Sequence, residues 1–438
     1  MTPAASDILP FNERTFMQLE VNPPVPWEMT PAELNAEVER HLRDKSRFVG
    51  HEWVVPTDTK WFGVKNRLIT EDLIRNYCNC VGDLNPLFRD ETYGKNTRWG
   101  GIVAPPMILH YVAMVSAGIG LEPPEVKERG GRLRIHGAGG LNVGGVVEFY
   151  EPIRPGDKFV CVDKFLGIDE VTKPEKPVPR LIRSMGQRKF LNQRGQVVAA
   201  ASGVELAMIP EKPLRKGEKK IAMGGRFPEP WTHYYSEEEI ARIDELMYAE
   251  QIRGAAPRFW EDVTEGDELV PLVKGPLTLT DIAAGMAFRG FMPAMEIRRR
   301  VDKSDDTYGN IDPRIGDMFG EYRCHVEEHL AQMYGEPGAF ATGTQFMEWV
   351  CHITTNWMGD DAFLKRLKCR NLRMMPVGDT CIVKGKVGRK FREDGDYLVE
   401  LAIEGKNWFG HTIFQASTIV RLLSRESSSW GAHMFASR

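Results

Sequence analysis

The strongest constraint on this 438-residue chain is an internal repeat, because its two halves carry similar short segments in the same order. Four pairs of segments match: 70–74 with 280–284, 88–93 with 325–330, 153–165 with 375–387, and 190–206 with 403–422. The second pair has an offset of 237 residues, which without any gap also places Gly101 on Gly338 and Ala104 on Ala341. Repetition in one order predicts two copies of a single folding unit.

The two copies differ in length at one place and are separated by a polar linker. Sixteen residues separate Asp72 from Phe88, whereas 44 separate Asp281 from His325, so the second copy carries about 28 extra residues there. Apolar residues of the segment 236–254 recur with helical spacing, which predicts an amphipathic connecting helix. We therefore expect an N-terminal extension (1–45), a first unit (46–210), a linker (211–262), a second unit (263–425, with an insertion at about 289–320) and a tail (426–438).

Each unit follows the same pattern of predicted elements. Two short helices flank a polar turn, and a longer apolar helix follows at 107–117 in the first copy and at 344–358 in the second. Three or four extended segments rich in Val, Ile, Thr and Phe come last. This order predicts an α+β unit in which a twisted antiparallel sheet wraps a long central helix. We expect the two sheets to join edge to edge, since joining satisfies strand edges that would otherwise aggregate.

The charge balance and the cysteines exclude several classes of protein. With 57 Lys and Arg against 61 Asp and Glu, the net charge of −4 gives no basic field for nucleic acid or an anionic membrane. The seven cysteines follow no disulfide, zinc or redox pattern, and even the closest pair, Cys78 and Cys80, is interpreted as structural. The N-terminus lacks the features of a secretion signal, and no apolar run approaches 18 residues. We expect a cytoplasmic protein.

Particular motifs resemble those of the dehydratases related to MaoC. Residues 82–88 (GDLNPLF) and 100–106 (GGIVAPP) are similar to the N-terminal domain of FAS1-like and MaoC-like dehydratases. The second half resembles the C-terminal half of fused MaoC-like acyl dehydratases in four segments: 274–281 (KGPLTLTD), 325–328 (HVEE), 341–343 (ATG) and 356–367 (NWMGDDAFLKRL). The resemblance covers about residues 45–425. It implies a double hot-dog fold and (R)-specific hydration of a 2-enoyl-CoA, or the reverse dehydration.

Adding water to an α,β-unsaturated thioester needs a general base for the water, an acid for Cα and a donor for the carbonyl as an enolate develops. In the family, an Asp and a His of the sequence D-x-N-P-[LI]-H hold the water. A backbone N–H at the start of the central helix polarises the carbonyl, helped by the helix dipole. The resemblance therefore implies that no metal or organic cofactor is required.

Both halves depart from that pattern. In the first, Phe88 stands at the histidine position, which implies a non-catalytic unit. In the second, His325 stands at that position, but Gly320 replaces the Asp. The nearest carboxylates are Glu321, followed by Asp317 and Asp312 within the insertion. We expect His325 to be catalytic with Glu321, or alternatively Asp317, as its partner.

The candidate substrate-binding residues are spread over both copies. Gly343 is a candidate N–H donor to the thioester carbonyl, with Thr344 beside it, although a glycine there could also serve close packing before the helix. Asp83 and Asn85 precede Pro86 and are expected mainly to build the turn, with substrate contact as the alternative. Arg299, within a run of three arginines, could bind CoA phosphates or belong to a solvated face.

The sequence thus predicts a hydro-lyase that acts on an acyl-CoA or acyl-carrier thioester, without a cofactor, in a homodimer or higher homo-oligomer. Two alternatives remain open at this point. A hot-dog thioesterase would use one carboxylate to direct water at the carbonyl, and a non-catalytic subunit would only bind the thioester or act as a scaffold.

Overall fold

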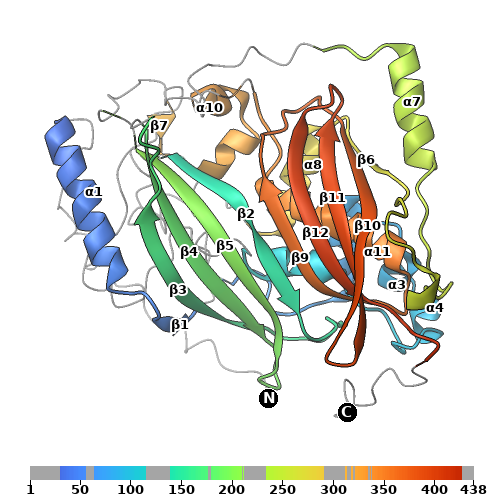
Figure 1. Cartoon of the computed structure of the whole chain (residues 1–438). Helices are drawn as coiled ribbons and strands as arrows, with labels where there is room; N and C mark the ends of the chain where they lie inside the picture. The colour runs from blue at the N-terminus through green and yellow to red at the C-terminus, as the bar shows by residue number, and fades with distance from the viewer. Residues whose placement is uncertain are drawn as a thin grey trace, which may run out of the picture.

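The computed structural model describes residues 30–55, 64–114, 139–175, 179–209, 211, 233–290, 311–312, 317–318, 321–333, 336 and 338–426. Within these ranges, ten strands form one sheet (Figure 1). Its strands, in spatial order, are β1 (Glu52–Val54), β3 (Val160–Glu170), β4 (Arg180–Leu191), β5 (Val197–Ile209), β2 (Gly139–Phe149), β9 (Phe363–Asn371), β12 (Thr412–Arg421), β11 (Asp396–Asn407), β10 (Cys381–Glu393) and β6 (Leu272–Lys274).

The strand order is a mirror image about the middle of the sheet. The first five strands come from the first half of the chain, the other five come from the second half, and each strand lies where its repeat partner lies. The two halves meet where β2 pairs antiparallel with β9, with Val146 opposite Lys368. This confirms the prediction that the two sheets join edge to edge. All the strand pairs of this sheet are antiparallel.

Matching hydrogen bonds in the two halves support the repeat residue by residue. The N–H of Ala104 donates to the carbonyl of Ile153, and the N–H of Ala341 donates to that of Met375, both at 2.8 Å. One segment needs a correction. Thr70 caps the first helix of its unit, and its structural counterpart is Thr278, not Thr280. The reason is that Thr278 forms a capping box with Asp281, which places Thr280 inside the helix.

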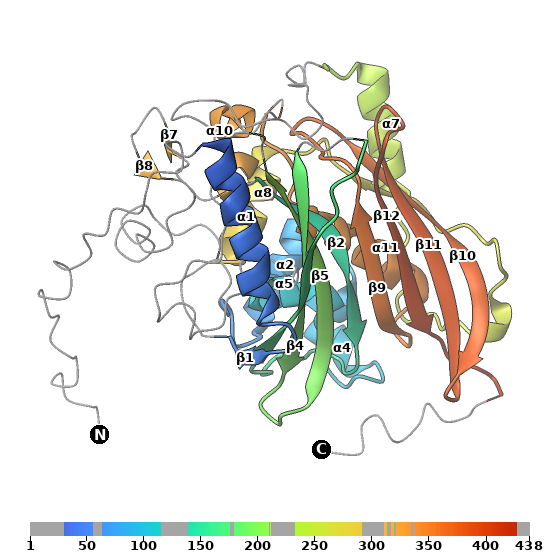
Figure 2. The ribbon, with the colours of Figure 1, turned by 60° about the vertical axis from the view of Figure 1, so that its left-hand side comes forward.

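The central helix of the second half is α11 (Gly343–Met358), which lies against the inner face of the sheet (Figures 1 and 2). Residues Thr344 to Met358 are all buried, and the polar ones among them need partners inside the protein. Gln345 caps its start by accepting the Thr342 N–H at 2.8 Å. The helix stops at Gly359, whose φ of 76° is in the region that favours glycine.

The central helix of the first half is much shorter than predicted. A 3-10 turn, η3 (Pro106–Ile108), leads into α5 (Leu109–Val112), and Ala113 is already extended. The helix ends here because its last carbonyls have other partners. The Val112 carbonyl accepts the Lys65 N–H at 2.7 Å, and the Tyr111 carbonyl accepts Nδ2 of Asn66 at 2.6 Å. Residues 115–138 lie outside the described part of the chain.

The remaining described elements are α1 (Pro31–Ser46), α2 (Glu71–Val81), α3 (Pro86–Arg89), α4 (Glu91–Lys95), α7 (Glu237–Tyr248), η4 (Trp260–Asp262), α8 (Leu279–Phe288), β7 (Ile311–Asp312), β8 (Asp317–Met318), η6 (Glu321–His325) and α10 (Glu328–Met333). The helix expected in the linker is α7, and Ile243 is its buried residue. Within the predicted N-terminal extension, Leu34 and Val38 of α1 pack against Ile182 and Ile209 of the sheet.

One apolar core runs through both halves and includes Trp349 and Trp357 of α11. All seven cysteines are free thiols, and six of them are buried, in agreement with the structural role predicted for them. Among the described residues, no helix has both the length and the apolar character that crossing a membrane requires.

Candidate active site

His325 ends the short helix η6 and lies just before α10. Its Nδ1 is 2.9 Å from the carbonyl oxygen of Phe340, and the two rings are in edge contact with their centroids 4.4 Å apart. A carbonyl oxygen can only accept, so Nδ1 must carry the proton of the neutral ring. The Nε2 atom therefore has its lone pair free to take a proton, and the backbone fixes this tautomer.

The surroundings of His325 keep the imidazole neutral. Burial lowers its pKa to about 4, the hydrogen bond to Phe340 acts in the opposite sense, and the positive charge of Arg289 lowers it further. The side chain nevertheless remains partly exposed. At neutral pH the ring is thus uncharged and able to accept a proton.

Gly343 is the first residue of α11 and the one residue of this helix that is partly exposed. The first N–H groups of a helix have no partner within the helix and lie at the positive end of its dipole. A Cβ at this position would lie 2.5 Å from Nδ2 of Asn371, so a larger residue would displace that side chain. Asn371 in turn donates to the carbonyls of Asn142 (3.1 Å) and Gly343 (3.4 Å), which ties the helix start to the β2–β9 junction.

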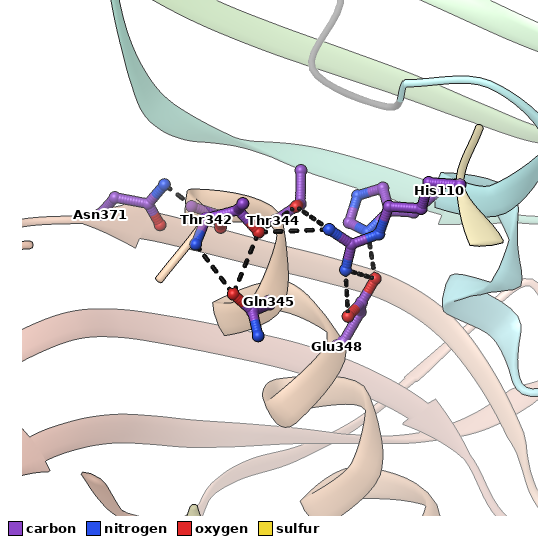
Figure 3. Close-up of polar contacts among 8 residues, drawn as sticks. His110, Thr342, Thr344, Gln345, Glu348 and Asn371 are labelled. Carbon is purple, nitrogen blue, oxygen red and sulfur yellow. Dashed lines mark hydrogen bonds and ion pairs between the residues drawn. The ribbon is translucent and has the colours of Figure 1, made fainter. Parts of the chain in front are cut away.

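A buried polar cluster lies beside the first turn of α11 (Figure 3). Nη2 of Arg289, the residue that caps the C-terminus of α8, donates to both carboxylate oxygens of Glu348 at 2.6 Å. Its Nη1 donates to the hydroxyls of Thr342 (3.2 Å) and Thr344 (3.0 Å). His110 of α5 completes the cluster, with Nδ1 3.2 Å from Glu348. Arg289 is 1% exposed and Glu348 2%, so the pair is shielded from water.

Charges in this cluster stabilise each other. Burial alone would raise the pKa of Glu348, but Arg289 and His110 lower it below its ordinary value. Burial lowers the pKa of His110, against the effect of Glu348. The cluster therefore holds one ionised carboxylate, one guanidinium and a neutral imidazole at neutral pH. Thr344, a predicted substrate-binding residue, is buried here with its hydroxyl bound to Arg289.

Asp83 and Asn85 build the turn, as expected. The carboxylate of Asp83 accepts the Asn85 N–H at 2.9 Å, and the Asn85 side chain accepts the Leu87 N–H at 3.0 Å. Both residues are buried. Phe88, at the histidine position of the first copy, is 4% exposed and belongs to the apolar core.

The other predicted residues lie in or beside the insertion. Arg299 lies outside the described residues, as does most of the insertion. Asp317 belongs to β8, which pairs with β7, and Glu321 begins the same 3-10 helix that ends at His325. For both carboxylates the structure describes the backbone position alone. The pairing of His325 with Glu321 or Asp317 therefore stays a prediction.

A second buried polar cluster joins the two halves near Asp83. His352 of α11 places Nε2 2.9 Å from Glu250 and 3.8 Å from Asp83, while its Nδ1 lies 2.8 Å from Nζ of Lys274. The Lys274 ammonium also donates to the Val81 carbonyl at 2.5 Å. Burial lowers the pKa of Lys274 to about 8, although Glu250 and Asp83 act against this.

Sequence reasoning did not identify either cluster. The signal available was the presence of the ionisable residues Glu348 and His352 on a helix predicted to be central, since a buried charge needs a partner. It also did not single out Glu336, in the loop between α10 and α11, a carboxyl whose pKa burial raises to about 7. Among the described residues, no group of His, Cys, Asp and Glu side chains is arranged to hold a metal ion.

Comparisons with known proteins find one family model and one curated relative that match part of this chain. Residues 57–201 match the family described as FAS1-like, dehydratase domain region. A UPF0336 protein of Thermobifida fusca is 27% identical over 93 residues, which are 21% of this chain and 57% of that protein. The chain thus matches little more than half the length of this curated relative.

Two solved structures resemble the whole chain. A MaoC-like dehydratase covers 87% of this chain over its own full length, with 17% identity and a TM-score of 0.58. A conserved hypothetical protein of Mycobacterium tuberculosis is described as having a double hot-dog fold. The match spans 85% of this chain and 96% of that protein, with 11% identity and a TM-score of 0.48. Residues 57–201 therefore match the FAS1-like dehydratase region, and the chain as a whole has a double hot-dog fold like that of a solved MaoC-like dehydratase.

Proposed function

We propose that this protein is a hydro-lyase that reversibly adds water to the 2-enoyl thioester of CoA or of an acyl carrier, with His325 as its general base. The observation that carries this proposal is the fixed, neutral imidazole of His325, bound through Nδ1 to the Phe340 carbonyl. Phe340 lies three residues before Gly343, so one short segment holds both the base and the helix N–H. A base beside a carbonyl-polarising donor is what enoyl hydration requires.

The reaction divides into two steps. In the first, Nε2 of His325 takes a proton from water while the water oxygen bonds to Cβ. The electrons of the double bond then move onto the thioester carbonyl. The resulting enolate oxygen accepts the N–H of Gly343 at the positive end of α11. In the second, the imidazolium returns its proton to Cα, which restores the neutral ring and completes the addition of one water.

Several features beyond the central step belong to the same proposal. Glu321 or Asp317 would orient the water, and Arg299 would bind a phosphate of CoA. The thioester carbonyl supplies the electron sink, so the reaction needs no cofactor. We place the protein in the cytoplasm as a homo-oligomer. The seven free thiols support a reducing compartment.

Incubation with crotonyl-CoA and, separately, with 3-hydroxybutyryl-CoA tests this proposal, with enone absorbance and free thiol followed in parallel. The expected result is loss of enone without release of CoA thiol, and formation of enone from the hydroxy ester. Release of thiol would instead indicate a thioesterase. If neither signal changes for CoA or acyl-carrier esters of several chain lengths, the protein is a thioester-binding or scaffold subunit and the proposal fails.

A further inference from the structure

Arg289 is connected to the start of α11 on both sides of Gly343. Its Nη1 donates to the hydroxyl of Thr342, the residue before Gly343, and to that of Thr344, the residue after it. Its Nη2 donates to Glu348, one helical turn further on. A single guanidinium thus fixes three residues around the candidate carbonyl-binding N–H, and its planar shape makes the arrangement rigid.

Arg289 lies beside the N-terminus of α11, where its hydrogen bonds reach the residues on both sides of Gly343. The N-terminus of a helix carries positive partial charge, so a cation beneath it is unfavourable unless a carboxylate compensates for it. Glu348 provides that compensation. A buried ion pair is often no more stabilising than apolar residues of similar volume. The pair does, however, hold the hydroxyls of the two residues that flank Gly343, through Nη1 of Arg289.

On this basis we infer that Arg289 is a positioning residue, which holds the Thr342–Thr344 segment so that the Gly343 N–H meets the thioester oxygen. The inference deepens the proposed function and rests on it. Arg289 comes from α8, so it connects the first helix of the second unit to the start of that unit's central helix. The charged and titratable groups around the guanidinium include Glu348, Tyr77 and Tyr111, and His110 contacts the same Glu348 oxygen, Oε1, as Nη2 of Arg289.

The decisive experiment compares Arg289→Met with the double variant Arg289→Met/Glu348→Gln. The single variant leaves a buried carboxylate without its partner, so it should unfold at a lower temperature. The double variant removes that charge and should recover most of the Tm. If Arg289 positions the helix N–H, kcat stays about 10²-fold below wild type in the double variant, the usual cost of losing one oxyanion donor. KM should change by less than about threefold, because the affected contact forms mainly in the transition state.

A second buried pair in the first unit provides the matched control. Arg188 donates to Asp163 through Nε (2.7 Å) and Nη2 (2.8 Å), and both residues are as buried as Arg289. The double variant Arg188→Met/Asp163→Asn should show a change in Tm similar to that of Arg289→Met/Glu348→Gln. Its kcat should stay within about twofold of wild type. Equal loss of kcat in both double variants would show a general effect of disturbing buried pairs and would overturn the inference.

Two further outcomes separate the inference from the proposed function. Wild-type protein that hydrates crotonyl-CoA normally, together with a fully active Arg289→Met/Glu348→Gln variant, overturns the role of Arg289 and leaves the proposed function intact. Wild-type protein without any hydratase activity overturns the proposed function and the inference with it. Arg289→Lys, which keeps the charge but loses the planar fork, should recover part of kcat if the charge contributes besides the geometry.

Discussion

The two copies place different residues at equivalent points of the same scaffold. At the histidine position, His325 is a partly exposed base, whereas Phe88 is buried in the core. At the start of the central helix, Gly343 offers an N–H, whereas Pro106 has none to offer. The surrounding sheet is nevertheless mirrored strand for strand, so the two copies present different residues on one scaffold. Besides these two positions, the copies differ in the length of the central helix and in the insertion that the second copy carries.

The first copy retains a carboxylate that the second copy lacks at the same point. Asp83 keeps the family's acidic position but is 1% exposed, and its carboxylate caps the Asn85 turn while facing His352 at 3.8 Å. The second copy has Gly320 at this position in the sequence. An acidic residue within a motif is therefore not by itself evidence of a reactive site. Its exposure and its partners decide the matter.

Loss of His325 is expected to give the largest effect. His325→Ala should lower kcat by about 10²–10⁴-fold, the usual contribution of a positioned proton-transfer group. KM should change little, since the CoA and acyl portions would provide most of the binding energy. Steady-state kinetics on the enoyl-CoA that wild type turns over measures both constants. His329→Ala, four residues further on, is the matched control and should keep wild-type kcat. A fully active His325→Ala enzyme would move catalysis to another part of the molecule.

The carboxylate partner of His325 is the next prediction. Glu321→Gln should lower kcat about as much as His325→Ala if Glu321 is the partner, and the double variant should be little worse than either single one. Such non-additivity is typical of residues that act as a unit. A silent Glu321→Gln with an inactive Asp317→Asn would assign the role to Asp317. Full activity in both would show that neither carboxylate takes part.

The acid limb of the pH profile gives a smaller effect. With the pKa of His325 lowered to about 4, kcat/KM should remain level from pH 8 to pH 6 and decline only at lower pH. The same shift affects stability. The folded-state pKa lies below the ordinary value of 6.5, so the unfolded chain binds the extra proton first and stability falls as pH drops from 6.5 towards 4. A kcat/KM midpoint near pH 6.5 would contradict a His325 whose surroundings lower its pKa.

The repeat made the architecture predictable from the sequence, whereas contacts between residues far apart in the chain could not be predicted from it. The sheet junction follows from two copies that each need an edge partner. The end of α5 does not follow from the repeat. Its last carbonyls accept hydrogen bonds from Lys65 and Asn66, which lie more than 40 residues earlier in the sequence. Thr278 and Thr280 are both reasonable helix caps in sequence, and only the side chain of Asp281 distinguishes them.

The candidate site was predictable in part for the same reason. His325 and Gly343 occupy positions that the repeat and the family motifs mark. Arg289 and Glu348 are 59 residues apart, so their pairing depends on where the tertiary fold places the C-terminal end of α8. A charged residue on a buried helix indicates that a partner of opposite charge lies nearby, but the sequence does not tell which arginine is that partner.

The smallest expected effect tests whether the two copies are equivalent at all. Restoring the histidine in Phe88→His should create no second site, so the Phe88→His/His325→Ala double variant should be as inactive as His325→Ala. Three observations support this. Phe88 is 4% exposed, so the new imidazole would be sealed in the apolar core. Asp83 already bonds to Asn85. Pro106, at the position of Gly343, lacks an N–H for the carbonyl.

The double variant should therefore show only a loss of stability, since a polar ring would replace a buried aromatic one. Thermal unfolding measures that loss, and Phe88→Leu serves as the control that changes volume without adding polarity. Hydratase activity above the His325→Ala level would mean that substrate reaches the first copy and that a donor other than the residue-106 N–H polarises its carbonyl. The asymmetry between the copies would then lie in one side chain, and the missing N–H and the short helix would have no part in it.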